Sequence, residues 1–252
     1  MQVDMSQKVI QIRELNYFYP DHTKAISDIS LDICEGESVG IIGPNGAGKT
    51  TLLLHLNGIL KGNGSVVICG LKIQEENLPE IRKKVGMIFQ NPDTQLFMPT
   101  VFDDVAFGPI NMDLSKKEVE ESVNQALEEV DMSGAIHRLA HHLSFGEKKR
   151  ISIATVLSMK PDILAMDEPT SNLDPKHRRM LIGLIKNFTH TKIIASHDLD
   201  LIGEVCTRII MLDKGSIVAQ GKTIEILKNK DLLEKHDLEI PLSLSGWGTS
   251  KI

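Results

Sequence analysis

Residues 43–50 follow the pattern Gly-x-x-x-x-Gly-Lys-Ser/Thr, which is typical of a loop that wraps around phosphate groups. Its glycines let the backbone approach phosphate oxygens closely, and the N–H groups at the start of a following helix present partial positive charge to the anion. Lys49 would reach the terminal phosphates, and the hydroxyl of Thr50 would bind Mg²⁺. The alternative is a glycine-rich turn without a ligand, which the strand-like residues before the loop and the helix-like residues after it disfavour.

Two adjacent carboxylates, Asp167 and Glu168, follow an apolar run at residues 163–166. Asp167 is suited to hold Mg²⁺, and Glu168 is suited to polarise an attacking water molecule. An acidic strand-to-loop turn would be the preferred interpretation without a phosphate loop, but the loop at residues 43–50 favours nucleotide hydrolysis. Residues 229–232 do not fit the Asn-Lys-x-Asp pattern that guanine selection needs, which argues against a GTPase.

The elements that must position these motifs alternate between strand and helix patterns. Strands are expected at residues 9–15, 29–33, 38–42, 65–69, 163–166 and 192–195, and a tight turn at Asn63 and Gly64. Helices are expected at residues 50–57, 116–130 and 175–188. The two late strands are short apolar runs of the kind found in buried parallel sheets. The chain is therefore predicted to have an α/β fold.

The middle of the chain, residues 93–159, has a helical pattern of apolar residues instead of the alternating strand and helix patterns. Between Lys116 and Val130 the apolar residues Val119, Val123 and Leu127 recur at helical spacing among many acids and lysines. We interpret this part as a helical insert within the α/β fold. The last residues, 227–252, carry a possible helix followed by a Ser/Gly-rich tail with the only tryptophan, Trp247.

The composition is that of an ordinary globular protein. Of 252 residues, 41% are hydrophobic, and 28 Lys and Arg against 34 Asp and Glu give a formal net charge of −6, which rules out disorder from too few apolar side chains. No apolar run approaches the ~18 residues that span a bilayer. Cys34, Cys69 and Cys206 are too scattered for a disulfide framework or a thiolate metal site, so a reducing cytoplasm is expected. The pI of about 5.9 argues against a nucleic-acid partner.

Residues 143–150, from Leu143 to Arg150, resemble the signature motif of ATP-binding cassette (ABC) proteins, placed shortly before the acidic pair as in that family. Further family motifs occur in order at Tyr19, the phosphate loop, Gln90, residues 171–174 and His197. The resemblance covers about residues 9 to 225. It implies a P-loop NTPase fold of the ABC ATPase type, with a mixed sheet core, an N-terminal antiparallel β subdomain and a helical subdomain. We expect the ATPase domain at residues 1–230, its helical subdomain at about 91–159, and a C-terminal extension at 231–252.

The resemblance also implies roles for individual residues. Tyr19 would stack on adenine, Gln90 would offer its amide oxygen to Mg²⁺ or to the attacking water, and His197 would contact the γ-phosphate. The cofactors would be ATP and Mg²⁺, with Glu168 and His197 catalytic and Mg²⁺ held by Thr50, Gln90 and Asp167. The phosphate-binding residues would be Asn45, Gly46, Ala47, Gly48, Lys49, Thr50 and Thr51. A non-enzymatic nucleotide-binding module would be expected to lack Glu168 or His197.

The signature motif implies a second ABC ATPase subunit, because the family uses it in trans. Ser144, Gly146 and Glu147 would meet ATP bound to another copy, so that ATP joins two subunits as a homodimer or a heterodimer. The motif departs from the family pattern at Phe145, where many members have glycine, and at Glu147, where many have glutamine. Asn172 replaces the usual alanine in the loop that ends at Asp174.

Residues 89–95 and 103–111 are similar to the ATPase of energy-coupling-factor (ECF) importers, especially the cobalt and nickel branch. The resemblance implies an integral membrane coupling subunit, a substrate-capture subunit, and a peripheral location at the cytoplasmic face of the membrane. The acidic Asp93, Asp103 and Asp104 would suit an arginine-bearing coupling helix, although a solvated acidic face is the usual alternative. An ECF importer for a vitamin or another small solute, and a soluble ABC ATPase outside transport, are the alternative functions.

Three histidines, His137, His141 and His142, invite a metal-site interpretation, because residues 137 and 141 would share a helix face. We disfavour this interpretation because no third ligand is evident. A transported metal need not touch this chain.

Overall fold

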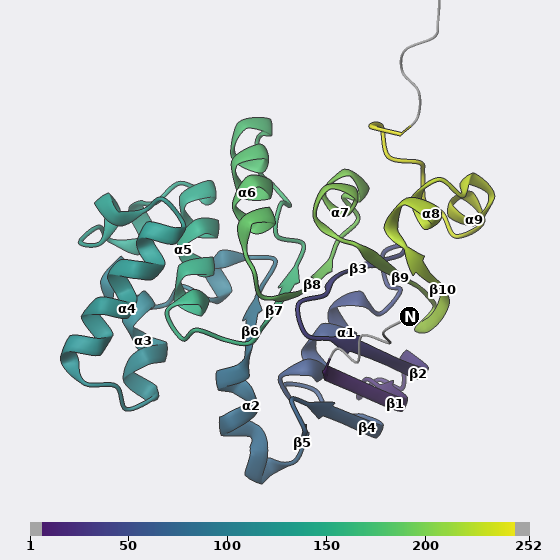
Figure 1. Ribbon diagram of the computed structural model, residues 1–252, viewed down its shortest axis with the longest axis horizontal. Helices are drawn as coiled ribbons and strands as arrows, with labels where there is room; N and C mark the ends of the chain where they lie inside the picture. Colours follow the sequence, from purple (N-terminus) through teal and green to yellow (C-terminus); the bar gives the residue numbers. More distant parts are fainter. Residues whose placement is uncertain (1–6, 245–252) are drawn as a thin grey trace, which may run out of the picture.

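The structure, a computed structural model, describes residues 7–244 and contains two β-sheets (Figure 1). The first is antiparallel, in the order β2-β1-β4-β5, with β1 (Lys8–Phe18), β2 (Lys24–Cys34), β4 (Asn63–Ile68) and β5 (Leu71–Lys72). The main sheet has the order β10-β9-β3-β8-β7-β6, with β3 (Ser38–Ile42), β6 (Val85–Ile88), β7 (Ile163–Asp167), β8 (Thr191–Ala195), β9 (Arg208–Asp213) and β10 (Ser216–Lys222). Its neighbouring strands run parallel except β9 and β10, so the predicted mixed sheet is confirmed.

Hydrophobic packing on both faces of the main sheet explains why its strands are continuous apolar runs. In β7, Ile163 and Ala165 pack into a cluster shared with the antiparallel sheet and α1 (Lys49–Leu56), whereas Leu164 and Met166 pack into a second cluster shared with the later helices. This division follows from the alternation of side chains along a strand. Figure 1 shows α1 on one side of the main sheet, and α6 (Pro175–Asn187) and α7 (Leu199–Val205) on the other.

The predicted helical insert forms a separate lobe at the left of Figure 1. It contains α3 (Val101–Asn111), α4 (Lys116–Glu129) and α5 (Phe145–Leu157), with the short 3₁₀ helices η2 (Pro92–Thr94), η3 (Ser133–Ala135) and η4 (Ala140–His142). Helix α4 buries Val119, Val123 and Leu127 as the periodicity predicts. It begins after Ser115, whose side chain and that of Glu118 form a reciprocal capping box that satisfies two backbone N–H groups.

The remaining helices connect these parts. The 3₁₀ helix η1 (Glu75–Asn77) and α2 (Leu78–Lys84) lead from the antiparallel sheet into β6, and α8 (Thr223–Leu227) and α9 (Lys230–Lys235) follow β10. The predicted helix near the C-terminus is therefore present, whereas Trp247 and the tail from residue 245 lie outside the described residues. None of the helices between residues 7 and 244 is long and apolar enough to cross a membrane.

The expected tight turn at Asn63 and Gly64 is wrong. Both residues belong to the start of β4, where Asn63 pairs with Asn16 of β1. The chain reverses earlier, between the end of α1 and residue 62. An Asn-Gly pair is a local hairpin signal, but here Asn63 pairs with β1, which lies far away in the sequence.

Candidate functional site

The carboxyl ends of four parallel strands bring the sequence motifs together. Strands β3, β8, β7 and β6 are neighbours in that order, so the residues that follow each of them meet at one edge of the main sheet. The phosphate loop follows β3, Asp167 ends β7 and Glu168 follows it, His197 follows β8, and Gln90 follows β6. Such an edge is where ligands bind in open α/β sheets.

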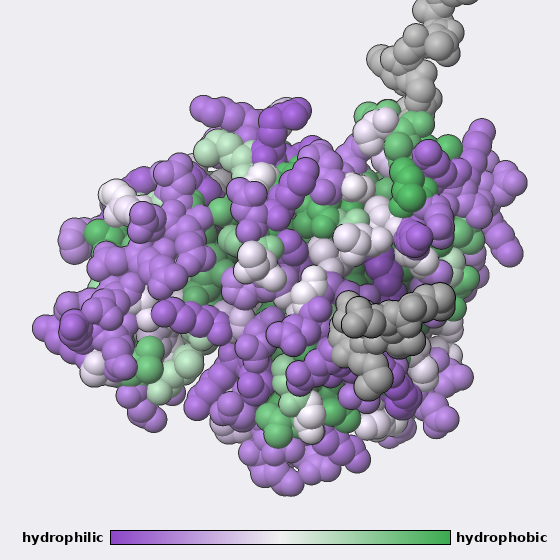
Figure 2. All heavy atoms as spheres, viewed as in Figure 1, coloured by the Kyte–Doolittle hydropathy of each residue, from purple (hydrophilic) through white to green (hydrophobic). Residues whose placement is uncertain are grey.

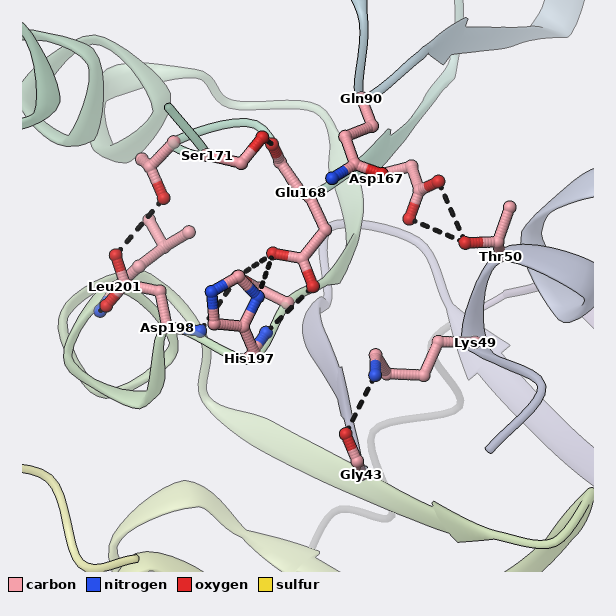
Figure 3. Close-up of polar contacts among 12 residues, drawn as sticks. Gly43, Lys49, Thr50, Gln90, Asp167, Glu168, Ser171, His197, Asp198 and Leu201 are labelled. Carbon is pink, nitrogen blue, oxygen red and sulfur yellow. Dashed lines mark hydrogen bonds and ion pairs between the residues drawn. The ribbon is translucent and has the colours of Figure 1, made fainter. Parts of the chain in front are cut away.

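The phosphate loop connects β3 to α1 in the predicted way. Gly48 precedes the helix with φ of 99°, and a Cβ atom at this position would lie 2.5 Å from the carbonyl oxygen of Ala25, so glycine is required. The Lys49 ammonium donates to the carbonyl oxygens of Gly43 at 2.7 Å and Pro44 at 3.0 Å. Burial lowers the pKa of Lys49, while Glu168 and Asp167 act in the opposite direction. The loop thus holds a largely buried cation beside two acids (Figure 3).

Thr50 and Asp167 meet across the site. The Thr50 hydroxyl donates to the Asp167 carboxylate at 2.9 and 3.1 Å. Asp167 is only 4% exposed, and burial raises its pKa, although the Thr50 hydrogen bond opposes this shift. A hydroxyl and a buried carboxylate in contact form a set of oxygen ligands of the type that Mg²⁺ prefers.

Glu168 is held by donors from the end of β8. Its carboxylate accepts hydrogen bonds from the Ser196 hydroxyl at 2.9 Å and from the backbone N–H of His197 at 3.0 Å, and Nδ1 of His197 lies 2.9 Å from the same group. The backbone of Glu168 has a φ of 44°, which is uncommon for a residue other than glycine and is found at functional sites. The Glu168 side chain therefore has a fixed direction, toward the strand that carries His197 (Figure 3).

A pocket of about 500 Å³ joins these groups. Its walls include Tyr19, Gln90, Glu168, His197 and the predicted loop residues Asn45, Gly46, Ala47, Gly48, Lys49, Thr50 and Thr51. Tyr19 lies in the turn between β1 and β2, and its hydroxyl is 2.9 Å from that of Thr51. The antiparallel sheet therefore presents an aromatic ring at the side of the pocket nearest α1. Asp167 is reached through Thr50 and does not itself line the pocket.

The signature residues lie outside this pocket, at the beginning of α5 in the helical lobe. Ser144 caps the helix, and its hydroxyl donates to Glu147 at 2.9 Å within a complete capping box. Glu147 also pairs with Arg138 at 2.6 Å, and this guanidinium lowers the pKa of the carboxyl to about 2. A Cβ atom on Gly146 would lie 3.0 Å from the ring of His177 at the start of α6. Ser144 and Gly146 thus form a compact helix N-terminus.

The structure gives a physical reason for two departures from the family pattern. The ring of Phe145 lies over the buried ammonium of Lys149, with Nζ 6.0 Å from the ring centroid, which is a cation–π arrangement. Asn172 has a φ of 60°, in the left-handed region that asparagine tolerates better than alanine. Phe145 and Asn172 therefore fit their local surroundings.

Several residues of the site were not found from the sequence. Ser196 binds Glu168 but has no motif of its own, and Thr23, Lys24 and Ala25 line the pocket from the antiparallel sheet. Arg178 of α6 donates two hydrogen bonds, of 2.6 and 2.7 Å, to the carboxylate of Asp198, the residue after His197. No local pattern predicts these contacts, because each depends on elements that are distant in the sequence.

A second groove, of about 590 Å³, lies between α2, α3 and α5. Its apolar walls include Ile59, Phe97, Phe107 and Met159, and the rings of Phe97 and Phe107 meet edge to face at 4.9 Å. Figure 2 shows an indentation between the left-hand lobe and the lower part of the molecule, on the side where α3 and α2 face each other in Figure 1.

Each of the acidic residues expected to meet an arginine of a partner subunit already has a hydrogen-bond or ion-pair partner within this chain. Asp104 is 3% exposed and accepts hydrogen bonds from the N–H groups of Phe97 and Met98, so its expected role in docking is wrong. Burial raises its pKa. Asp103 accepts from the hydroxyl of Thr100, which caps α3, and Asp93 pairs with Lys148 at 2.7 Å. These carboxylates organise the loop that forms the groove.

His137 and His141 do not share a helix face. His137 lies in a turn, whereas His141 and His142 belong to η4, so that part of the prediction is wrong. Among residues 7–244, no group of three His, Cys, Asp or Glu side chains could hold a metal ion.

The fold and the site define a P-loop ATPase, and comparison with known proteins identifies the family. Residues 26–171 match the family model described as "ABC transporter", and the chain belongs to this family. It is an ABC ATPase that hydrolyses ATP to drive transport.

Individual relatives agree with this assignment. The chain is 47% identical, over 239 residues, to the energy-coupling factor transporter ATP-binding protein EcfA of Methanothermobacter thermautotrophicus. The aligned region covers 92% of this chain and 77% of that protein. Its structure is similar to CbiO1 of Clostridium perfringens, described as part of the ABC transporter complex CbiONQ, with a TM-score of 0.81, 36% identity, and coverage of 91% of this chain and 94% of that one. The cassette MJ0796, a dimer bound to ADP and Pi, gives a TM-score of 0.77 at 26% identity, with coverage of 85% and 98%.

Proposed function

We propose that this protein is the ATP-hydrolysing subunit of an ECF-type importer for cobalt or nickel ions, peripheral at the cytoplasmic face of the membrane. The observation that carries the membrane-coupling part of the proposal is the apolar groove between α2, α3 and α5, which opens beside the segment that follows Gln90. The likeness to EcfA and to CbiO1 supports the importer type. The domain limits inferred from the sequence, 1–230 with a helical subdomain at about 91–159, are part of the proposal.

Within the nucleotide pocket, we assign a role to each side chain from its position. Lys49 and the backbone N–H groups of residues 45–51 would bind the phosphates, with Tyr19 against the adenine ring. Glu168 would take the proton of the attacking water, because its carboxylate is already oriented by Ser196 and the N–H of His197. His197 has a side chain that is 63% exposed, and it would donate to the γ-phosphate at the mouth of the pocket.

Thr50, Asp167 and Gln90 would hold Mg²⁺. The fit rests on the buried carboxylate of Asp167, which contacts the Thr50 hydroxyl and would be stabilised by a cation. Gln90 is exposed and lines the same pocket, so its amide oxygen is available to the ion. When bound, Mg²⁺ would neutralise charge on the phosphates.

Two copies, or this chain and a related subunit, would enclose ATP between the phosphate loop of one and the signature residues of the other. Ser144, Gly146 and Glu147 lie outside the nucleotide pocket of their own chain, so they are available to a second one. The beginning of α5 offers N–H groups and a positive helix end to a γ-phosphate. The dimer of MJ0796 supports this arrangement.

The groove would receive an amphipathic helix of the integral membrane coupling subunit. Phe97, Phe107 and Ile110 are 63%, 44% and 58% exposed, which is a large apolar surface for one end of a helical lobe. Charged side chains at this groove come from Arg82 and Lys83 of α2, whereas Asp104 is occupied by backbone donors. The docking helix is therefore expected to bury apolar side chains and to place an acidic group near α2. A separate capture subunit would bind the metal.

Co-purification tests this function. A tagged form of the chain, expressed from its native operon, should recover membrane proteins from detergent-solubilised membranes, and the purified complex should contain cobalt or nickel. Recovery of a complex that carries a vitamin would support the proposed importer but contradict cobalt or nickel as its substrate. Recovery of the chain without any membrane protein would contradict the proposal and favour a soluble ABC ATPase.

A further inference from the structure

Lys149 of the signature helix α5 is a lysine with no exposed surface. Lysine is almost never fully buried unless its charge is compensated. Within the described residues 7–244 its ammonium forms no ion pair with a carboxylate. Burial lowers the pKa of Lys149 to about 8, and the nearby acids Asp167 and Glu168 oppose the shift. Because burial of a charged ammonium costs free energy, Lys149 needs specific hydrogen-bond acceptors.

The partners of Lys149 are two backbone carbonyl groups of the nucleotide site. Its Nζ donates to the carbonyl oxygen of Gln90 at 2.5 Å and to that of Glu168 at 3.2 Å. The carbonyl of Glu168 also accepts from the N–H and the hydroxyl of Ser171, which begins the loop to α6. Lys149 therefore joins the helical lobe to both residues that flank the expected position of the attacking water, and the ring of Phe145 covers it.

The same helix is attached to the segment after Gln90 at two further points. The amide nitrogen of Gln95 donates to the carbonyl oxygen of Ser152 at 2.6 Å and to the hydroxyl of Thr155 at 2.8 Å. Lys148 pairs with Asp93 at 2.7 Å. A displacement of α5 must therefore carry residues 90–95 with it, because three side chains hold them together.

The helix and this segment also form walls of the apolar groove. Phe89, Gln95, Thr155, Val156 and Met159 all line it, and Thr155 and Val156 lie on α5, about two turns beyond Lys149. A helix seated in the groove would press on the element that carries Lys149. A displacement at the groove would then reach Glu168 through α5 and through the hydrogen bond from the Lys149 ammonium to the carbonyl of Glu168.

We propose that Lys149 is a positioning residue that sets the backbone of Glu168 and transmits occupancy of the groove to it. Glu168 needs such support, because its φ of 44° persists only if its surroundings hold it. Hydrogen bonds from an ammonium are stronger than those from a neutral donor, which suits a link that must carry a displacement. The part that concerns the groove depends on the proposed docking of a membrane subunit, whereas the part that concerns Glu168 does not.

The test compares Lys149→Met, which keeps the length of the side chain but removes the donor, with Lys149→Arg, which keeps a cationic donor. A matched control is Lys192→Met. Lys192 of β8 is another buried lysine, 6% exposed, and its Nζ also donates to two backbone carbonyls, those of Ile185 at 3.2 Å and Phe188 at 2.7 Å, away from the pocket.

In the isolated protein, Lys149→Met should lower kcat for ATP hydrolysis by about 10-fold or more, with KM and the binding of a fluorescent ATP analogue nearly unchanged, because a small misplacement of a catalytic group affects turnover. Lys149→Arg should recover most of kcat. Lys192→Met should lower the melting temperature and leave kcat unchanged. A wild-type kcat in Lys149→Met, or an equal loss of kcat in Lys192→Met, would overturn the positioning role.

In the membrane complex, Lys149→Met should assemble normally in a pull-down while ATP hydrolysis is no longer stimulated by the membrane subunit. Stimulation at the wild-type factor would overturn the transmitting role. If the wild-type chain itself recovers no membrane subunit, the proposed function fails, and the measurements on the isolated protein still decide whether Lys149 positions Glu168.

Discussion

The carboxylate of Glu168 lies 2.9 Å from Nδ1 of His197, because β7 and β8 are parallel neighbours whose carboxyl ends carry the two residues. The environments of the two side chains differ: that of Glu168 is 10% exposed and that of His197 is 63% exposed. The acid is thus held inside the pocket by Ser196 and the backbone, and the imidazole stands at its mouth. In the proposed mechanism, this arrangement would separate activation of water by Glu168 from contact of His197 with the phosphate.

Replacing Glu168 by glutamine should retain ATP binding and slow steady-state hydrolysis by at least ~100-fold, because the change removes the proton acceptor while preserving the shape of the side chain. Hydrolysis is measured by phosphate release, and nucleotide binding and thermal unfolding serve as controls. Undiminished hydrolysis by the folded variant would show that another group accepts the proton.

Replacing Ser144 by arginine should abolish the ATP-bound dimer, because a bulky cation would occupy the position expected for the γ-phosphate of the second subunit. Light scattering with ATP in the Glu168→Gln background measures the assembly. Loss of the Ser144 cap alone costs about 1 kcal/mol, so Ser144→Ala is the matched control for helix stability and should weaken the dimer less. A dimer of unchanged affinity in Ser144→Arg would refute the use of the signature in trans.

Replacing Phe107 by glutamate should prevent recovery of the membrane subunit, since it would place a charge on the apolar wall of the groove. ATP hydrolysis by the isolated protein should change little, because Phe107 does not line the nucleotide pocket. Val218→Glu is the control: Val218 is 38% exposed, against 44% for Phe107, and lies in β10 at the opposite edge of the main sheet from β6. Equal recovery of the complex with both variants would count against this docking site.

Replacing Glu147 by glutamine should lower the free energy of unfolding by about 1 kcal/mol near neutral pH, because Glu147 closes the capping box of α5 and pairs with Arg138. Its pKa is lowered from 4.5 to about 2, so the stabilisation is complete above about 4.5 and is lost as the pH falls toward 2. Urea unfolding of both proteins across this range should show the difference shrinking in acid.

A control for the Glu147 prediction is Glu118→Gln in α4. Glu118 closes a similar capping box with Ser115, but among the described residues it pairs with no arginine. Its replacement should therefore cost less. A pH-independent effect of Glu147→Gln would mean that the carboxylate charge contributes nothing.

Much of the nucleotide site could be predicted because each motif is local. The phosphate loop and the acidic pair are short segments at strand ends, and parallel strands bring such ends to one edge. Asp104 and Lys149 show what local patterns miss. In the sequence, Asp104 looks like one of several acidic residues in a charged segment. In the structure it is buried under a loop and accepts hydrogen bonds from the backbone N–H groups of that loop.

Lys149 reads as one of three consecutive basic residues, 148–150, yet the helix turns it inward while Lys148 pairs with Asp93. Its partners are backbone carbonyls of residues 59 and 19 positions away, and these carbonyls carry no sequence signal. The prediction of a turn at Asn63 was wrong for a related reason. Pairing with β1 outweighed the local preference of an Asn-Gly pair for a tight turn.

ATP-driven uptake by the reconstituted importer is the most direct test that this chain energises metal transport. The chain and its co-purified membrane subunits are placed in vesicles, and entry of labelled cobalt or nickel is followed with ATP on the side of the ATPase. We predict uptake that requires ATP and disappears with Glu168→Gln. Uptake that persists in that variant, or ATP hydrolysis by the intact complex without entry of either metal, would contradict the proposed role of this chain in metal import.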